Sequence, residues 1–376
     1  MLRRNRLVGA AALAAAGTLV LGACGSDNNS SGGGSSPSNN GSGTTNAAGG
    51  ITCSSGTLTA SGSTAQTNAM SQWTKAYQTQ CGSATINYQG GGSGQGVTQF
   101  TAGTVDFAGS DFPLSSAQKP DADKRCGSGN QAIDIPMVPG PIAVAYNLPG
   151  ITDLKLSASN VAKIFSGKIT KWNDQAIKAD NPSANLPGTS IQTFHRSDGS
   201  GTSYNFTNYL SNDAKSDWTY GVNKNWPAPG GQGAKGSSSV AQGVKSTTGG
   251  IGYFENSFAT QNSLSVAQLG DGKGNFVPLT ADNTTKFLSF AKVSGTNGDL
   301  ALTFNYANGD ASAYPNVLVT YEIVCQKGTS SSKLPLLKNF LGYTVNSGQD
   351  LLTSNGYVKL PTEIQTQSAS AVSGLS

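Results

Sequence analysis

Short apolar runs that end in glycine and serine alternate with stretches in which apolar residues recur at helical spacing. Three of these runs predict strands: GTLTASGST (56–64), ATINYQG (84–90) and TVDFAGSD (104–111). Between the first two, Met70, Trp73 and Tyr77 recur at helical spacing, and Thr64 is placed to start that helix. A second helix is predicted between the second and third strands. This order of strand, helix, strand, helix and strand predicts an α/β lobe with a mainly parallel sheet.

The same pattern continues beyond this first segment. The long apolar run IDIPMVPGPIAVAYNLPG (133–150), punctuated by proline and glycine, suits a strand that passes between two lobes. The predicted elements that follow are a helix ending near Phe165, a strand, loop and helix over 190–210, a strand and short helix over 246–259, an apolar strand over 316–326 and a helix pair over 334–361. The folded part, about 325 residues, exceeds what one core usually supports, so two lobes are expected.

The first residues predict export from the cytoplasm. Three arginines (Arg3, Arg4 and Arg6) precede an apolar run of signal-peptide length, which is too short for a good membrane span. The run ends in Leu-Gly-Ala-Cys24, which resembles a lipobox, the site where bacterial lipoproteins are diacylated on cysteine and cleaved before it. An ordinary secretory cleavage site beside a chance cysteine is the alternative. Residues 1–23 are thus a predicted signal peptide, and Cys24 is a predicted lipid anchor to the cell membrane on its extracytoplasmic side.

Two further features bear on the function of the chain: the composition of residues 24–50 and the balance of basic and acidic residues. Residues 24–50 are rich in Gly, Ser and Asn, have no apolar periodicity and carry almost no charge, so we expect a flexible tether. Three of the 24 basic residues lie in the leader, and the remaining 21 nearly balance the 20 acidic residues. No basic face or stripe of the kind that nucleic-acid binders carry is visible. Nucleic acid is therefore not an expected partner.

Five cysteines leave four once Cys24 is lipidated. An even number in an exported chain predicts two disulfides, for which four cysteines allow three pairings. We favour Cys53 with Cys81, at the start of a strand and the end of the following helix, and Cys126 with Cys325. A metal site is the rival interpretation, but none of the spacings is of the CxxC type and the only histidine is His195. No metal or other cofactor is expected.

One recurring feature is a strand that ends in glycine or hydroxyl residues and opens a helix. It occurs at Ser61–Thr64, Gly90–Gly94 and Gly199–Thr202. A helix N-terminus has unpaired N–H groups and a partial positive charge, and glycine lets the backbone approach an oxygen closely. In open α/β sheets, loops at the carboxyl ends of the strands meet at the ligand site. Arg196 adds a guanidinium that can bind two oxygens of a phosphate-like anion, and Asp198 can hold it in place.

At these residues the chain resembles a known family. The segments ASGST, NYQGGGSGQGVTQF, TVDFAGSD, IFSGKITKWND, HRSDGSGTSYNFTNYL and GGIGYFE, in this order, closely resemble the PstS family, the phosphate-binding proteins of bacterial high-affinity phosphate ABC transporters. The resemblance runs from about Leu58 to the last helices. It implies a two-lobed class II periplasmic-binding-protein fold with a central ligand cleft and hinge strands. It also implies a monomer that performs no chemistry on phosphate and delivers it to permease and ATPase subunits.

The resemblance also implies specific site residues and domain limits. Carried over position by position, the phosphate contacts are Thr64, the Ala65 backbone, Ser93, Asp111, Arg196, Ser200, Gly201 and Thr202, with Asp198 orienting Arg196. Ala65 departs from the family pattern, in which an aromatic residue commonly stands. Domain I is expected over 51–140 and 318–376, domain II over 141–317, and the hinges near Pro139–Tyr146 and Pro315–Tyr321.

Asp111 is the most informative of these residues, because a carboxylate inside an anion site is costly. Hydrogen phosphate keeps a proton that an ionised Asp111 can accept, whereas sulfate has none and would be repelled. A helix N-cap is the structural alternative for this residue. For the whole protein, the alternatives are a secreted phosphatase-like enzyme and a surface adhesin. The chain lacks a histidine pair, a carboxylate cluster for two metals and a G-x-S-x-G stretch, which disfavours an enzyme.

Overall fold

The structure is a computed structural model that describes residues 46–47 and 51–376. The predicted signal peptide, Cys24 and nearly all of the predicted tether lie outside the described residues. Within the range expected to be tether, Asn46–Ala47 (β1) forms a short strand that pairs antiparallel with Ile51–Thr52 (β2). Residues 51–376 belong to one compact unit. No helix in the described ranges is long and apolar enough to cross a membrane.

A nine-stranded sheet runs through the described part of the chain in the order β4-β3-β5-β16-β6-β10-β8-β9, with β11 also pairing with β6. Its strands are β3 (Gly56–Gly62), β4 (Ala84–Gly90), β5 (Phe107–Ser110), β6 (Ala132–Asn147), β8 (Gln192–Arg196), β9 (Gln232–Ala234), β10 (Gly250–Glu255), β11 (Ser265–Val266) and β16 (Val317–Cys325). At one end β3 pairs in parallel with β4 and β5, and at the other β8 pairs in parallel with β9 and β10. The parallel pairing expected in the first lobe is therefore confirmed, and the second lobe has parallel pairing as well.

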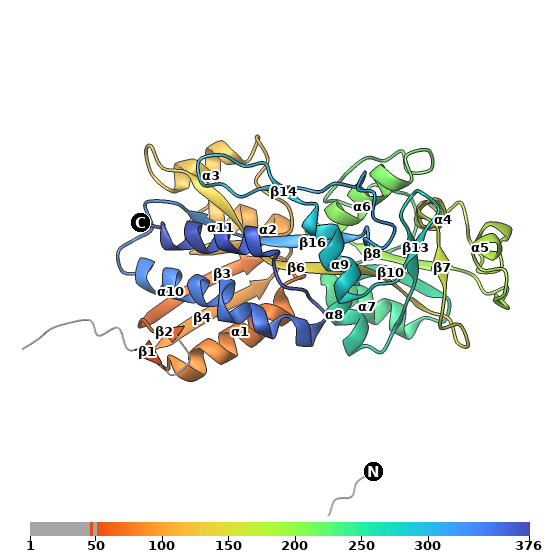
Figure 1. Cartoon of the computed structure of the whole chain (residues 1–376), viewed down its shortest axis with the longest axis horizontal. Coiled ribbons are helices and arrows are strands. Elements are labelled where there is room, and N and C mark those ends of the chain that lie inside the picture. Colours follow the sequence, from red (N-terminus) through yellow and green to blue (C-terminus); the bar gives the residue numbers. More distant parts are fainter. Residues whose placement is uncertain (1–45, 48–50) are drawn as a thin grey trace, which may run out of the picture. The chain divides into compact units, whose positions relative to one another are not determined.

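Two long buried strands connect the two ends of this sheet. The first part of β6 pairs antiparallel with β16, and its last six residues, Ile142–Asn147, pair antiparallel with β10. This confirms that the proline-rich apolar run crosses between lobes (Figure 1). The register of β16 on β6 shifts between Thr320 and Tyr321, an irregularity of the kind that often lies beside functional sites.

The first lobe is built from both ends of the chain, as Figure 1 shows with orange and blue elements side by side. Its helices are α1 (Thr67–Gln80), α2 (Ser93–Thr101), α3 (Lys119–Arg125), α10 (Leu334–Val345) and α11 (Thr362–Ser373). On one face of the sheet the Tyr77 ring meets the Phe340 ring edge-on at 5.4 Å, and Trp73 donates to the Gly348 carbonyl at 2.7 Å. On the other face, residues of α2, α3 and β16 form a separate apolar cluster.

The second lobe contains the middle of the chain. Its helices are α4 (Ala158–Phe165), α5 (Gln175–Asp180), α6 (Gly201–Asp213), α7 (Gly236–Ser246), α8 (Asn256–Gln261) and α9 (Ala281–Ser289), with a small sheet made by β7 (Lys155–Leu156), β12 (Gln268–Gly270) and β13 (Phe276–Val277). The hairpin of β14 (Lys292–Val293) and β15 (Leu302–Thr303) follows α9 and reaches back to the first lobe, where the Leu300 N–H donates to the Asp134 carbonyl of β6. An aromatic cluster supports α6: Phe206 stacks on Tyr253 at 4.2 Å and meets Phe165 edge-on at 4.9 Å. The fold is thus a two-lobed α/β architecture, as expected.

Two expectations about local structure need correction, and one helix was not expected. The first helix begins at Thr67 and has no side-chain cap, so Thr64 lies in the preceding loop. The expected helix pair over 334–361 is one helix, α10, followed by the 3₁₀ turns η1 (Ser347–Leu351) and η2 (Thr353–Asn355), which end at Gly356 in the left-handed region. The last helix, α11, was not expected, because few of its residues are apolar and the sequence pattern there is weak.

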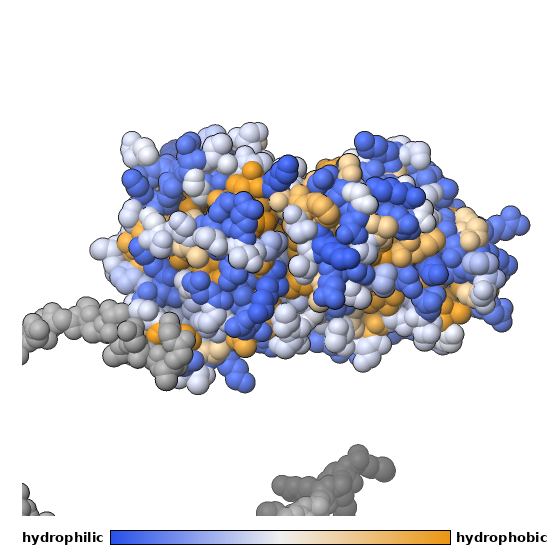
Figure 2. Space-filling view, in the orientation of Figure 1, coloured by the Kyte–Doolittle hydropathy of each residue, from blue (hydrophilic) through white to orange (hydrophobic). Residues whose placement is uncertain are grey.

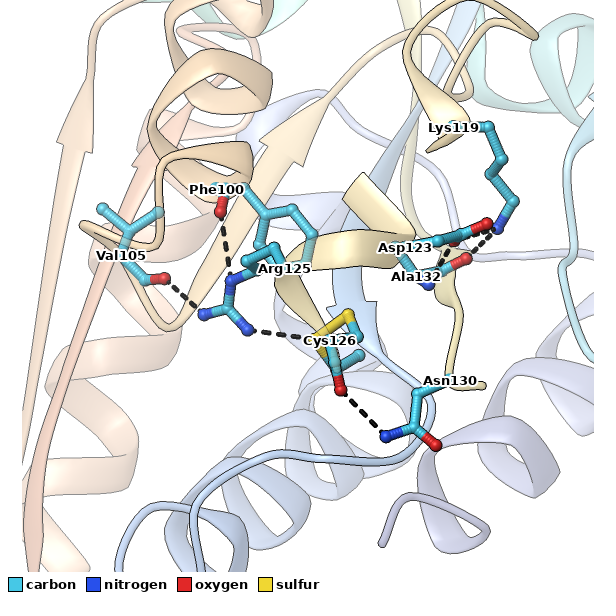
Figure 3. The surroundings of a disulfide bond; sticks show 9 residues. Phe100, Val105, Lys119, Asp123, Arg125, Cys126, Asn130 and Ala132 are labelled. Carbon is cyan, nitrogen blue, oxygen red and sulfur yellow. Dashed lines mark hydrogen bonds and ion pairs between the residues drawn. A yellow bond between two sulfur atoms is a disulfide. The ribbon is translucent and has the colours of Figure 1, made fainter. Parts of the chain in front are cut away.

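Both predicted disulfides, Cys53–Cys81 and Cys126–Cys325, are present. The second joins the end of α3 to the end of β16, and Figure 3 shows its surroundings. The adjacent Arg125 donates to the carbonyls of Phe100 (3.0 Å) and Val105 (2.8 Å). This disulfide therefore fixes the C-terminal crossing strand to the N-terminal half of the first lobe.

The surface in the view of Figure 2 is mostly hydrophilic or of intermediate hydropathy, with small apolar areas scattered over it. Among the described residues, Val222 is the only large hydrophobic side chain that is strongly exposed. The monomeric state stays a prediction.

Candidate functional site

The loops at the carboxyl ends of β4, β5 and β8 meet where the two lobes face each other. Ser93, at the start of α2, donates its hydroxyl to Asp111 Oδ2 at 3.1 Å and accepts a hydrogen bond from the Gly201 N–H at 3.2 Å. The Gly94 N–H donates to the Gly199 carbonyl at 2.9 Å. Two of the three predicted anion-binding loops are therefore in direct contact across the lobes.

Glycine is required at two positions of this junction. Gly92 has φ of +96°, and a β-carbon there would lie 2.3 Å from Asp198 Oδ2. A β-carbon at Gly201 would lie 2.4 Å from the β-carbon of Asp111 and 2.7 Å from Ser93 Oγ. These distances are far below any ordinary contact. The glycines allow the backbone of one lobe to approach the polar side chains of the other.

Arg196, the last residue of β8, is 1% exposed and makes an ion pair with Asp198. Its Nε donates to Asp198 Oδ1 at 2.7 Å and its Nη2 donates to Asp198 Oδ2. Burial alone would lower the pKa of Arg196, but the hydrogen bonds and charge of Asp198 raise it overall. Burial likewise opposes ionisation of Asp198, but Arg196 holds the pKa of that carboxyl below its ordinary value. Both groups are therefore charged at neutral pH.

The guanidinium also reaches hydroxyl groups from other elements. Its Nη1 donates to Thr202 Oγ1 at 3.2 Å and to Ser237 Oγ at 3.1 Å. Thr64 lies next to them, with its Oγ1 at 3.0 Å from Ser237 Oγ and accepting from the Ser237 N–H at 3.2 Å. The loop after β3, the start of α6 and the start of α7 thus converge on one buried cation.

Asp111 follows β5 and is 3% exposed. Its Oδ1 accepts from the Thr320 hydroxyl at 2.6 Å, in addition to the Ser93 bond to Oδ2. Burial raises the pKa of Asp111 to about 6, and the charge of Glu255 contributes to the rise, while nearby hydroxyls lower it. Asp111 is therefore mostly ionised at pH 7 and is able to accept hydrogen bonds.

Known proteins with similar sequences place the chain in a family. Residues 42–347 match the family model of the PBP superfamily domain. The chain is 39% identical to the phosphate-binding protein PstS3 of Mycobacterium bovis (strain BCG / Pasteur 1173P2), over 100% of both chains, and 41% identical to PstS2 of the same strain, over 98% of both. The chain belongs to the PstS family of phosphate-binding proteins. The resemblance noted in the sequence is confirmed.

Solved structures agree on the fold of this PstS-family chain. A high-affinity periplasmic phosphate-binding protein (PfluDING) bound with phosphate is 21% identical, with a TM-score of 0.67 over 83% of this chain and 92% of that one. A phosphate-binding protein from Stenotrophomonas maltophilia is 19% identical, with a TM-score of 0.63 over 84% and 93%. The relatives are solute-binding transport proteins, so the expectation that the chain is not an enzyme is confirmed.

The structure of this PstS-family chain brings together most of the predicted site residues. Arg196, Asp198, Thr202 and Thr64 form one group, while Ser93, Asp111 and Gly201 form another at the start of α6. Two predicted contacts already have partners within the chain. The Ala65 N–H donates to Ser63 Oγ at 2.9 Å, and Ser200 Oγ caps α6 by accepting from the Ser203 N–H at 3.1 Å.

His195, which precedes Arg196 on β8, stacks its ring on that of Trp226, with the ring centroids 5.0 Å apart. Among the residues that the structure describes, no group of three or more His, Cys, Asp or Glu side chains is placed to hold a metal ion.

Three residues of the site were missed by sequence reasoning: Ser237, Glu255 and Thr320. Ser237 opens α7 after Gly236, whose φ is +77°, so it repeats the signal that identified the other loops. Thr320 is a hydroxyl residue inside an otherwise apolar strand, a signal that could have been used. Glu255 ends the GGIGYFE segment, and nothing in the sequence alone assigns it a role.

Proposed function

We propose that this protein binds inorganic phosphate in the cleft between its lobes, at the residues around Arg196 and Asp111, and delivers it to the permease of an ABC transporter. The observation that carries the proposal is that a buried cation, Arg196, and a buried hydrogen-bond acceptor, Asp111, lie in the same site. Arg196 is neutralised by Asp198, so the ligand is held mainly by neutral N–H and O–H donors, while Asp111 accepts a proton that the ligand carries.

The proposed ligand contacts are Thr64, Ala65 N–H, Ser93, Asp111, Arg196, Ser200, Gly201 and Thr202. Where these groups have partners within the chain, as Ser200 and the Ala65 N–H have, the ligand shares or replaces those bonds. Domain I is proposed to comprise 51–140 and 318–376, and domain II 141–317. Hinge motion of the crossing strands near Pro139–Tyr146 and Pro315–Tyr321 then admits and releases phosphate.

The protein is also proposed to be held at the extracytoplasmic face of the membrane through lipid on Cys24, with the segment up to residue 50 as a tether. Two acyl chains on one cysteine give stable anchoring, whereas a single chain does not. Expression of Cys24→Ser in the native cell tests the anchor. The variant is expected to leave the membrane fraction and to lose the mass of the lipid; continued membrane association would contradict the anchor without affecting the proposed ligand.

The proposed site is tested by isothermal titration of phosphate into protein prepared without phosphate. The wild type is expected to bind one phosphate at micromolar concentration or more tightly. Arg196→Ala is expected to lose at least about a hundredfold in affinity, because two or more charge-assisted hydrogen bonds disappear. Asp350→Asn, at an exposed position on η1, is the matched control and should bind as the wild type does. Normal affinity in Arg196→Ala with an unchanged melting temperature would place the site elsewhere.

A further inference from the structure

A cavity of about 320 Å³ lies beside α6, beyond the first turn that contributes to the proposed phosphate site. Its walls come from both lobes: Pro113 and Tyr321 belong to the first lobe, Asn205 and Asn208 to α6, and Tyr306 to the segment after β15. Small-molecule sites commonly measure about 300–1,000 Å³. A water molecule takes about 30 Å³ in the liquid, so one or two bridging waters would not fill this space. The cavity is large enough for a small organic molecule.

Three amide side chains line the cavity along one side of α6. Asn205, Asn208 and Asn212 follow at spacings of three and four residues, which places them on the same face of the helix. Asn205 Nδ2 donates to the carbonyls of Asp111 at 2.6 Å and Gly201 at 3.0 Å, which leaves its own carbonyl oxygen for a ligand. Asn212 Nδ2 donates to the carbonyl and Oδ1 of Asn208, which leaves the side-chain N–H groups of Asn208. The helix thus offers an acceptor and donors.

Aromatic rings supply much of the remaining lining, namely Tyr204, Phe304, Tyr306 and Tyr321. Phe287 of α9 supports two of them, since its ring centroid lies 6.0 Å from that of Phe304 and 5.2 Å from that of Tyr306. The Tyr306 hydroxyl oxygen is buried and has no hydrogen-bond partner among the described residues. A buried hydroxyl without a partner is costly, so a ligand that forms a hydrogen bond with Tyr306 would remove that cost.

The charges of the lining favour a neutral ligand. No lysine, arginine or histidine is among the described residues that line the cavity, so an anion would have no counter-charge. The one carboxyl group is that of Asp111, whose two oxygens already accept from Ser93 and Thr320. An apolar ligand would leave the amides and the Tyr306 hydroxyl unpaired. A neutral molecule with several hydroxyl groups fits instead, because its hydroxyls donate and accept while its C–H groups pack on the rings.

We propose that this cavity is a second ligand site, which binds a neutral polyhydroxylated molecule of about the size of a monosaccharide. Because the walls come from both lobes, the occupant favours the arrangement in which the lobes are close together. Its binding is therefore coupled to the binding of phosphate. The coupling rests on the proposed function, since it assumes that phosphate closes the same two lobes, whereas the second site itself does not.

The first test is titration of glucose, galactose and myo-inositol into the wild type, with and without saturating phosphate. At least one of them is expected to bind one to one with a dissociation constant of about 1 mM or tighter. Phosphate should tighten this binding about fivefold or more, and the polyol should tighten phosphate binding by the same factor. Maltotriose distinguishes a free sugar from the end of a glycan, since only a site for glycan ends would bind the trisaccharide equally well. No binding of any of the three small polyols in either state would overturn the proposal.

Two variants test whether the polyol binds in this cavity. Tyr306→Phe keeps the ring and removes the unpartnered hydroxyl, so it is expected to bind the polyol about tenfold more weakly, with the affinity for phosphate alone within about twofold of the wild type. Asn208→Leu places an apolar side chain in the cavity and should abolish polyol binding. Tyr220→Phe removes a tyrosine hydroxyl away from the cavity and is the matched control.

The outcomes separate the second site from the proposed function. Equal polyol affinity in the wild type, Tyr306→Phe and Asn208→Leu would place the polyol elsewhere and overturn the assignment of the cavity. Polyol binding that phosphate does not change would overturn the coupling. A wild type that binds a polyol but no phosphate would overturn the proposed function and leave the second site in place.

Discussion

Glu322, in the middle of the crossing strand β16, is expected to limit the stability of the folded protein at neutral pH. It is 0% exposed, and neither of its carboxyl oxygens has a hydrogen-bond partner among the described residues. It pairs in register with Gly109 of β5 and Ile135 of β6. Burial raises the pKa of Glu322 from its ordinary value of 4.5 to about 8; nearby Asp111 adds to the rise and the Gln66 side chain moderates it.

The magnitude follows from this difference in pKa. Between pH 4.5 and 8, Glu322 is ionised in the unfolded chain but protonated in the folded protein. The folded state therefore binds more protons, and its stability falls by about 1.4 kcal/mol for each pH unit in that range. At pH 7 the accumulated loss is about 3 kcal/mol, a large fraction of the stability of a typical protein.

Glu322→Gln removes this loss, because the amide keeps the shape of the protonated acid and cannot ionise. The quantity to compare is the free energy of unfolding of the two proteins. The excess of Glu322→Gln over the wild type is expected to rise by about 3 kcal/mol between pH 4.5 and 7. Guanidinium denaturation followed by tryptophan fluorescence, in phosphate-free buffers at several pH values, measures it. Glu363→Gln on the exposed face of α11 is the matched control. A difference that does not change with pH would refute the reasoning.

Three further predictions concern the site and the disulfide that anchors β16. Gly201→Ala is expected to fold but to bind phosphate at least about tenfold more weakly, since its β-carbon would collide with Asp111; unchanged affinity by titration would contradict the close approach. Sulfate is expected to be rejected at pH 7.5 and to bind at pH 5, because Asp111, with a pKa of about 6, is protonated at pH 5 and can donate a hydrogen bond. Rejection of sulfate at both pH values would argue against a role of Asp111 in excluding sulfate. The double variant Cys126→Ala/Cys325→Ala removes a disulfide whose cysteines are 199 residues apart in the sequence. Its free energy of unfolding, measured by denaturant titration, should be about 3–5 kcal/mol lower than that of the wild type. A loss below about 1 kcal/mol would show that packing alone fixes β16.

The elements of the first lobe could be predicted because their patterns are local. The strands that became β3, β4 and β5 are short apolar runs that end in glycine or serine, and Trp73 and Tyr77 mark the buried face of α1. The helix α11 could not be predicted from periodicity. Its contacts with the rest of the lobe come through few apolar residues, such as Ile364 and Val372, so tertiary packing decides its structure.

The candidate site was predictable to the extent that glycine and hydroxyl residues mark helix starts. The loops around Ser93 and Gly201 carry that signal and do meet. The contact of Thr320 with Asp111 spans 209 residues, and no local pattern reports a pairing at that distance. Glu255 was missed for the same reason, since its partner Thr202 lies 53 residues away on another element.

The most direct test of phosphate selection by Asp111 is anion selectivity at pH 7, measured by titrating phosphate and then sulfate into the wild type and Asp111→Asn. We expect the wild type to bind phosphate and not sulfate. Asp111→Asn should bind phosphate about tenfold to a hundredfold more weakly and should gain measurable sulfate binding, because the amide can donate where the carboxylate repels. Equal selectivity in the two proteins would contradict the claim that Asp111 selects the ligand by its proton.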